Sequence, residues 1–145
     1  MNSAEQNVQR LKRFYEEAAR GKWSAALDLL DPLVEWVEPN VRGLWFRGTH
    51  LGVDAVFREV IKPTLDHVSE FCVDIEQFFP VGDHIIALGQ FRGRGKQTGK
   101  ELNAPTAHIW TFRADKAVRF EAYQDIPRWL EALGETRTES ERFAA

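Results

Sequence analysis

The stretch DHIIALGQFRGRGKQTGKELNAPTAHIWTFRADKAVRFEAYQD, residues 83–125, decides the fold class. It contains three runs rich in β-branched and aromatic residues, separated by the turn-like segments KQTG and ADK. A fourth run of the same kind, EFCVDIEQFF at residues 70–79, precedes the turn PVGD. Because links this short join antiparallel neighbours, residues 70–125 predict a four-stranded antiparallel meander.

The residues before this meander show helical patterning in two places. Apolar residues over 8–18 follow helical spacing, Ser3 and Gln6 fit a capping box, and Gly21 is placed to end this helix. Residues 23–30 repeat the helical spacing over a shorter length, which an Asp-Pro pair ends. We therefore expect two consecutive helices in the first part of the chain.

A strand, a loop and another helix are expected between these helices and the meander. Residues 33–39, LVEWVEP, alternate as a strand does and end at a proline. Residues 40–52 hold three glycines and predict a loop. Residues 53–61 return to helical spacing, and Pro63 is expected to limit that helix. After the meander, residues 127–133 predict a short closing helix.

This order of elements predicts an α+β protein. Helices come first and a mostly antiparallel sheet follows, with no internal repeat or interdomain linker. A sheet of this length has to curl, and helices can cover only one of its faces. We therefore expect a single domain over residues 1–145, with a core of about residues 8–133 and a frayed tail at 135–145.

The composition is that of an ordinary globular protein. Hydrophobic residues make up 43% and charged residues 28%, and a net charge of −3 gives no general attraction for nucleic acid. No apolar run approaches the roughly 20 residues of a membrane helix, and the polar N-terminus does not resemble a signal peptide. The single cysteine, Cys72, excludes an internal disulfide and is expected to pack within a strand. We expect a cytoplasmic protein that binds neither nucleic acid nor membranes.

Three segments carry a resemblance to a known family. FYEEAARGKWSAALDLLDPLVEWVEP (14–39), FRGTHLGVDAVFREVI (46–61) and the stretch 83–125 resemble the SnoaL-like branch of the nuclear transport factor 2-like superfamily. The resemblance implies a cone-shaped, cystatin-like α+β roll, with a curved and mostly antiparallel sheet around one apolar pocket. It is specific for the fold and weak for any one reaction, because one fold hosts many chemistries.

Two relatives, ketosteroid isomerase and the polyketide cyclase that names the branch, imply roles for particular residues. The isomerase base is an acid before a proline at the end of the first strand, and Glu38 before Pro39 is similar to it. The isomerase oxyanion-hole Tyr falls on Phe14, which has no hydroxyl, and the adjacent Tyr15 is expected to point about 100° away. The pocket His of the cyclase aligns with His108. The chain thus keeps a base and a donor without either complete catalytic set.

Strand parity favours the same two residues. Glu38 shares parity with Trp36, so its carboxylate is expected in an apolar space, where desolvation raises its pKa toward neutrality. The alternative is a strand-end Glu that reaches solvent. His108 shares parity with Trp110 and would polarise a carbonyl or shuttle a proton, unless it is a core His satisfied by its neighbours.

The remaining site candidates are aromatic residues and one acid. Asp125 is a third catalytic candidate, although it could instead cap the closing helix. Its strand neighbour Tyr123 shares its face, which is either the pocket face or the opposite one. The aromatic residues considered as substrate-binding walls are Phe14, Trp36, Trp45, Phe46, Trp110 and Tyr123. Packing in the core or in a dimer is the alternative for them.

Two functions from different classes follow from these residues. The first is a cofactor-independent enzyme, isomerase-, cyclase- or lyase-like, acting by proton transfer on a small, mainly apolar carbonyl compound, with Glu38 as base and His108 as donor. The second is a non-catalytic module of the same fold that binds a small hydrophobic ligand. No spacing fits a metal site or a nucleotide fingerprint, so no cofactor is expected. A homodimer through the sheet is expected, because residues 85–88 are apolar on both parities.

Overall fold

The structure is a computed structural model that describes residues 2–134 of the 145-residue chain. Its helices are α1 (Ser3–Ala19), α2 (Trp23–Leu27), α3 (Val53–Val56), the π-helix η1 (Phe57–Ile61), α4 (Lys62–His67) and α5 (Ile126–Leu133). Its strands are β1 (Leu30–Glu38), β2 (Gly48–Leu51), β3 (Val68–Val81), β4 (His84–Gly95), β5 (Glu101–Arg113) and β6 (Lys116–Gln124). The tail that was expected to fray, residues 135–145, lies outside the described residues.

All six strands form one sheet in the order β2-β1-β6-β5-β4-β3. Strands β3 to β6 are the antiparallel meander expected from residues 70–125. β1 lies parallel to β6, and β2 pairs antiparallel with the other edge of β1. The predicted α+β class, with a curved and mostly antiparallel sheet, is therefore confirmed.

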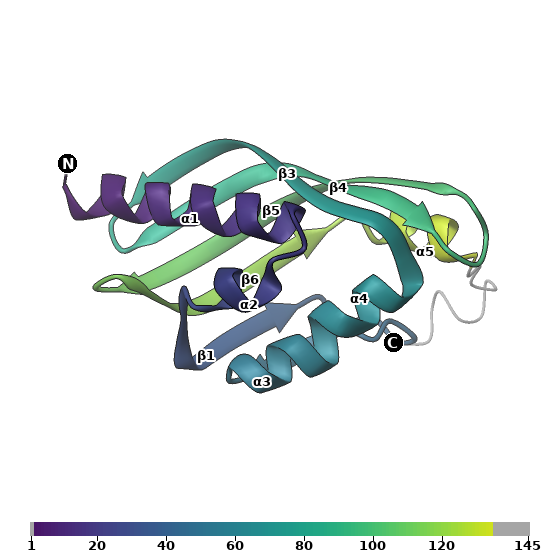
Figure 1. Ribbon diagram of the computed structural model, residues 1–145, viewed down its shortest axis with the longest axis horizontal. Helices are drawn as coiled ribbons and strands as arrows, with labels where there is room; N and C mark the ends of the chain where they lie inside the picture. The colour runs from purple at the N-terminus through teal and green to yellow at the C-terminus, as the bar shows by residue number, and fades with distance from the viewer. Residues whose placement is uncertain (1, 135–145) are drawn as a thin grey trace.

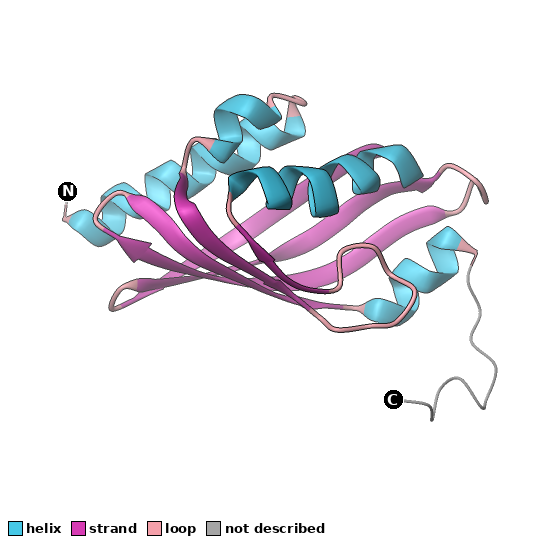
Figure 2. Ribbon diagram, turned by 90° about the horizontal axis from the view of Figure 1, so that it is seen from below, coloured by secondary structure: helices cyan, strands magenta, loops and turns pink. Residues whose placement is uncertain are grey.

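The helices form a layer on one side of this sheet. Helices α1 to α4 lie over its inner face, and within residues 2–134 no helix covers the other face (Figure 1, Figure 2). α1 packs along β3, and α5 packs against β5 and β4. None of the helices in this part of the chain is long and apolar enough to cross a membrane.

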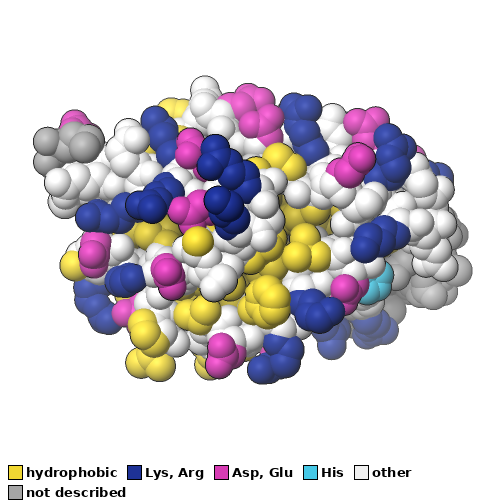
Figure 3. Space-filling view, in the orientation of Figure 1, with side chains coloured by type: hydrophobic (Ala, Val, Ile, Leu, Met, Phe, Trp, Pro, Cys, Tyr) yellow, Lys and Arg dark blue, Asp and Glu magenta, His cyan; other side chains and the backbone are white. Residues whose placement is uncertain are grey.

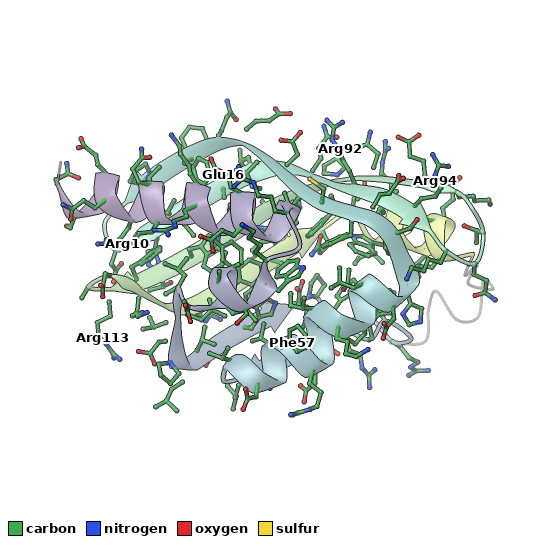
Figure 4. All side chains as sticks on the ribbon, in the orientation of Figure 1. Arg10, Glu16, Phe57, Arg92, Arg94 and Arg113 are labelled. Carbon is green, nitrogen blue, oxygen red and sulfur yellow. The ribbon has the colours of Figure 1, made fainter. Side chains whose placement is uncertain are left out.

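Strand alternation decides which side chains enter the space between the layers. In β5 every second residue from Leu102 to Phe112 is buried, and this set includes His108 and Trp110. The residues that alternate with buried positions along a strand point outward. On β4, the exposed side chains of Arg92 and Arg94 do so in Figure 4.

Several element ends differ from the sequence expectations. The capping box of α1 is formed one residue earlier, by Asn2 and Glu5, with Glu5 N donating to Asn2 Oδ1 at 2.8 Å. β1 starts at Leu30, before the proline, and its pairing with β6 is irregular until Glu35. A proline is tolerated in this strand because the ladder has no regular hydrogen bonds there to lose.

The region expected as a glycine loop and a short helix also differs. Residues 48–51 form β2, because pairing with the edge of β1 outweighs a composition that favours a loop. The following helix runs past Pro63 to His67 by way of η1. Pro63 is the second residue of α4 and directly follows the π-helical turn η1.

Candidate active site

A buried cavity lies between the helical layer and the inner face of the sheet. Its volume is about 50 Å³, and its walls come from both layers. Most of the lining side chains are aromatic or aliphatic; the strongly polar ones are Tyr15, Glu38, Thr64, His108 and Gln124. An apolar cavity that holds benzene has a volume of about 150 Å³. A ligand of that size would therefore need a wall side chain to move.

Trp23 is one of the wall side chains that line both this cavity and a groove on the outside of the protein. Its indole lines the buried cavity and also an outer groove, whose walls include Leu27 of α2 and Phe57 of η1. Figure 3 shows hydrophobic side chains gathered near the middle of this face, over the region where α2 and α4 lie in Figure 1.

Glu38, the last residue of β1, holds its carboxylate at this cavity. Its Oε2 accepts a hydrogen bond from Trp36 Nε1, and its Oε1 accepts one from Gln124 Nε2, both at 3.0 Å. Burial raises the pKa of Glu38 to about 7, against the opposing effects of these two hydrogen bonds and of the charge on His50. A carboxyl group with this pKa is available as a proton acceptor near neutral pH.

His108 of β5 faces the same cavity and is held by a hydroxyl from α1. Its Nδ1 lies 2.7 Å from the hydroxyl oxygen of Tyr15, which also accepts a hydrogen bond from Trp110 Nε1 at 2.9 Å. Because an indole can only donate, Tyr15 accepts the hydrogen bond from Trp110 and still has its own hydroxyl proton, which it can donate to His108 Nδ1. In this arrangement the ring proton of His108 sits on Nε2, a buried atom with no partner among the described residues.

Tyr15 and His108, which form this buried relay of hydrogen bonds with Trp110, stay uncharged at physiological pH. Burial lowers the pKa of His108 to about 3, so the ring is neutral. Burial also raises the pKa of Tyr15, so the phenol keeps its proton, although the hydrogen bond from Trp110 acts in the opposite direction. A neutral imidazole of this kind can donate a hydrogen bond from the ring nitrogen that carries its proton.

His50 on β2 supports the Glu38 end of the site. Its Nδ1 lies 2.7 Å from Glu59 Oε1, and its Nε2 lies 2.8 Å from the carbonyl oxygen of Phe46. The hydrogen bond from His50, followed by that from Arg58, holds the pKa of Glu59 below its usual value. His50 pairs with Trp36 across the β1–β2 ladder, so it lies next to the indole that donates to Glu38.

Of the six expected aromatic walls, the structure places Phe14, Trp36 and Phe46 at the cavity. Trp110 is fully buried but stands behind Tyr15, to which it donates its hydrogen bond. Trp45 turns away from the cavity because its loop neighbours Leu44 and Phe46 take the inward positions. Its indole stacks on His67 with ring centroids 4.5 Å apart and donates to Thr64 Oγ1 at 3.0 Å.

Tyr123 and Asp125 do not belong to the cavity, and their expected roles are corrected. Tyr123 is 54% exposed and donates its hydroxyl to Glu121 Oε2 at 2.6 Å. A register shift in the β5–β6 pairing puts Gln124, and not Tyr123, on the inner face. Asp125 caps α5: its Oδ1 accepts from Arg128 N at 3.4 Å, and its Oδ2 lies 3.2 Å from Arg128 Nε.

Tyr15, Thr64, Gln124 and Trp129 are cavity residues with polar groups that sequence reasoning did not assign to the site. Phe14 and Tyr15 are neighbours on α1, yet both line the cavity, because the cavity wraps around the helix face that carries both rings. The angle of about 100° between neighbouring side chains around the helix axis is therefore too small to keep Tyr15 out of the cavity that Phe14 lines. Gln124 could have been found only from the β6 register, which the ADK turn obscures.

The other chemically active side chains lie away from this cavity. Cys72 is half-buried on β3, and burial raises the pKa of its thiol. Within residues 2–134, no three His, Cys, Asp or Glu side chains come together in a group that could hold a metal ion. The polar chemistry at the cavity is therefore that of Glu38, His108 and the groups that hold them.

Comparisons with known proteins identify the family. The sequence model of the SnoaL-like domain matches residues 11–120, which is most of the chain. The protein therefore belongs to the SnoaL-like domain family, within the nuclear transport factor 2-like superfamily, as the resemblance in its sequence indicated. No curated protein matches the chain closely.

Solved structures share the fold over almost the whole chain. A nuclear transport factor 2-like protein of unknown function from Burkholderia pseudomallei is 26% identical, with a TM-score of 0.82, over 92% of this chain and 98% of that one. TerC, co-crystallised with polyporic acid, is 23% identical, with a TM-score of 0.80, over 89% and 98%. A candidate SnoaL-like polyketide cyclase from Jannaschia is 14% identical, with a TM-score of 0.77, over 94% and 97%.

Proposed function

We propose that the protein is a cofactor-independent enzyme that moves a proton on a small, uncharged, mainly apolar carbonyl compound. One observation carries the proposal: a single apolar cavity is lined by a carboxyl group whose pKa is raised to about 7 and by a His whose Nε2 is buried without a partner. Unpaired buried polar groups and perturbed pKa values are costly to keep, and they concentrate at functional sites.

The proposed step is removal of a proton from the carbon next to the carbonyl group. The Glu38 carboxylate accepts this proton as the C–H bond breaks, and the electron pair moves through the new carbon–carbon double bond onto the carbonyl oxygen. The Nε2–H of His108 donates a hydrogen bond to that oxygen and stabilises its developing negative charge. Protonated Glu38 then returns the proton to the same carbon or to another one, which gives back the carbonyl compound or an isomer.

The surroundings of each group suit its role. Hydrogen bonds from Trp36 and Gln124 orient the carboxylate of Glu38 but do not bring its pKa back to the ordinary range. When the Tyr15 hydroxyl donates to His108 Nδ1, the proton of the ring is held on Nε2, where the substrate oxygen would accept it. TerC, which shares the fold, was co-crystallised with polyporic acid, an organic compound, and we propose that this chain takes an organic ligand into its cavity.

Deuterium exchange tests this proposal without knowledge of the natural substrate. The protein is incubated in D₂O with acetone or cyclohexanone, and mass spectrometry follows deuterium entering the α-carbons. We expect exchange above the buffer rate, and a fall of about 10²- to 10⁴-fold in Glu38→Gln, as for the loss of a general base. Glu35→Gln is the matched control, since Glu35 lies on the same strand and pairs with Arg119 away from the cavity. Exchange that is unchanged in Glu38→Gln would overturn the mechanism.

A binding module without turnover is the second candidate. The observation that favours it is the narrow cavity of about 50 Å³, together with the hydrogen bonds that already occupy both oxygens of Glu38. The same assay separates the two candidates. Ketone binding, seen as shifts of the His108 ring signals in NMR, combined with no catalysed exchange would identify a binding module.

We also propose that two copies associate through the uncovered face of the sheet. Three large side chains on the meander strands, Phe79, Val81 and Tyr123, are 44%, 58% and 54% exposed. Within residues 2–134, no helix covers that face (Figure 2). A second copy of the same face would remove this apolar surface from water.

A further inference from the structure

Two buried donors at the cavity have no partner within residues 2–134, and the proposed reaction uses only one of them. These atoms are Nε2 of His108 and Nε1 of Trp129. Both side chains line the cavity, and both are 2% exposed. The indole of Trp129 is therefore a second buried polar group at this cavity with no partner among residues 2–134.

Trp129 is held firmly at its end of the cavity. Its helix, α5, is capped by Asp125 at its start and ends at Gly134 in the left-handed conformation. Its ring packs against Phe46 and Phe91, with centroids 5.1 and 5.3 Å away. Because these contacts fix the ring, Nε1 cannot swing to solvent to find a partner.

Phe91 connects the two unpaired donors in space. Its ring lies 5.6 Å from that of His108 and 5.3 Å from that of Trp129, measured between centroids. The two side chains therefore contact one and the same ring in the cavity wall, and one ligand that lies against Phe91 would touch both. An indole nitrogen can only donate a hydrogen bond. Nε2 of His108 is also a donor only in the tautomer in which Tyr15 donates to Nδ1. Each position thus requires an acceptor on the ligand.

The other cavity walls limit the charge of that ligand. Within the described chain, no Lys or Arg lines the cavity, whereas Glu38 contributes a carboxyl group. An anionic ligand would be buried beside an acid with no cation to balance it. Aromatic rings form much of the remaining wall and favour a flat or cyclic apolar body.

We propose that Trp129 is a specificity-determining donor, and that the substrate is an uncharged cyclic compound with two acceptor oxygens on separate carbons. One oxygen, the reacting carbonyl, accepts from His108, and the second accepts from Trp129. This inference rests on the proposed function for the carbonyl at His108. It adds the class of substrate, namely a dicarbonyl or hydroxycarbonyl compound instead of a simple ketone.

The test compares cyclohexanone with cyclohexane-1,4-dione, two rings of similar size with one and two carbonyl groups. Binding to the ¹⁵N-labelled full-length protein is followed by NMR, using the indole N–H signals and the His108 ring signals. We expect the dione to bind about three- to tenfold more tightly, which is the contribution of one neutral hydrogen bond. The Trp129 indole signal should move with the dione and stay in place with cyclohexanone.

Trp129→Phe keeps an aromatic ring and removes the N–H group, so in this variant the preference for the dione should disappear. Trp45→Phe is the control: it removes an indole from the same aromatic cluster, but its N–H already donates to Thr64 and its ring does not line the cavity. In Trp45→Phe the preference should remain. The indole spectrum of each variant shows directly whether the rest of the fold is intact.

Three results would overturn the inference. Equal affinities for the two ketones, with shifts at His108 but none at Trp129, would remove it and leave the proposed function standing. A cross-peak from the Trp129 indole proton to a buried water that the dione does not displace would show that water alone occupies this position. Failure of both ketones to perturb His108 would remove the inference and the proposed carbonyl site together.

Discussion

At the scale of single residues, burial in the cavity shifts the pKa values of two polar groups in opposite directions. Burial disfavours charge, so it raises the pKa of the Glu38 carboxyl group to about 7 and lowers the pKa of the His108 imidazole to about 3. Both groups are therefore neutral over much of the mildly acidic range. Near pH 7 only the acid begins to ionise, which leaves one acceptor and one neutral imidazole in the same cavity.

The pH dependence of stability follows from the Glu38 pKa. Folded Glu38 holds its proton up to about pH 7, whereas an unfolded chain loses it near 4.5. The folded state binds more protons in this window, so its contribution is present below pH 4.5 and is lost as pH rises through 7. Urea unfolding measures how much the free energy of unfolding falls between pH 5 and pH 8. We expect this fall to be smaller in Glu38→Gln than in the unaltered protein by roughly 2–3 kcal/mol.

The comparison between these two proteins also removes the effect of His108. Its folded pKa is depressed from 6.5 to about 3, so its contribution is present above pH 6.5 and is lost as pH falls. This effect opposes that of Glu38 and is common to both proteins. Equal pH slopes for the two proteins would show that Glu38 is not buried as an acid.

Tyr15 gives a second prediction at this scale. Tyr15→Phe removes the hydroxyl that pairs with His108 and Trp110, so two buried groups lose their partner. We expect a cost of about 2 kcal/mol or more in the free energy of unfolding. His108 should also become a mixture of tautomers, visible in its ¹⁵N ring shifts. Tyr123→Phe removes an exposed hydroxyl and should change stability by less than about 0.5 kcal/mol. Similar costs for the two variants would contradict the buried relay.

The sequence pattern predicted some of these residues because parity along one strand is a short-range property. Glu38 follows Trp36 by two positions and His108 precedes Trp110 by two, so each pair shares a face whatever the rest of the fold does. The Tyr15 contact could not be predicted in this way. It spans 93 positions of the chain and depends on how α1 lies across β5.

At the scale of elements, the meander was predictable and the segments around β2 and η1 were not. Turn residues mark the ends of the meander strands locally, and each strand pairs with its neighbour in sequence. β2 exists because the edge of β1 is available, and this pairing outweighs a glycine-rich composition. The π-helix η1 supplies Val60 and Ile61 to the cavity, in keeping with the frequent use of such turns at functional sites.

The close approach of α5 to the meander gives a prediction at this scale. A Cβ atom added at Gly95 would lie 2.0 Å from the carbonyl oxygen of Ala132, which is backbone and cannot rotate away. Gly95→Ala should therefore push α5 off β4, cost about 1–3 kcal/mol and shift the Trp129 indole signal. Glu101→Ala, an exposed change on the neighbouring strand, should leave both unchanged. A Trp129 signal that stays in place in Gly95→Ala would contradict the tight docking of α5.

At the scale of the whole molecule, the helices within residues 2–134 lie on one face of the sheet, and the opposite face is left for a partner to cover. We predict that light scattering at micromolar concentration gives about twice the 16.7 kDa mass of one chain. Phe79→Lys combined with Val81→Lys should give the single-chain mass, because two charges on the apolar face oppose its burial. A single-chain mass for the unaltered protein would contradict the proposed dimer.

The central claim is that Glu38 is a buried acid poised to accept a proton at neutral pH in the cavity it shares with His108. A ¹³C NMR titration of the glutamate side-chain carboxyl groups tests it most directly, with Glu38→Gln identifying the Glu38 signal by its loss. A midpoint of about 7 is the predicted result. A midpoint near the ordinary value of 4.5 would show a solvated carboxylate and contradict the account.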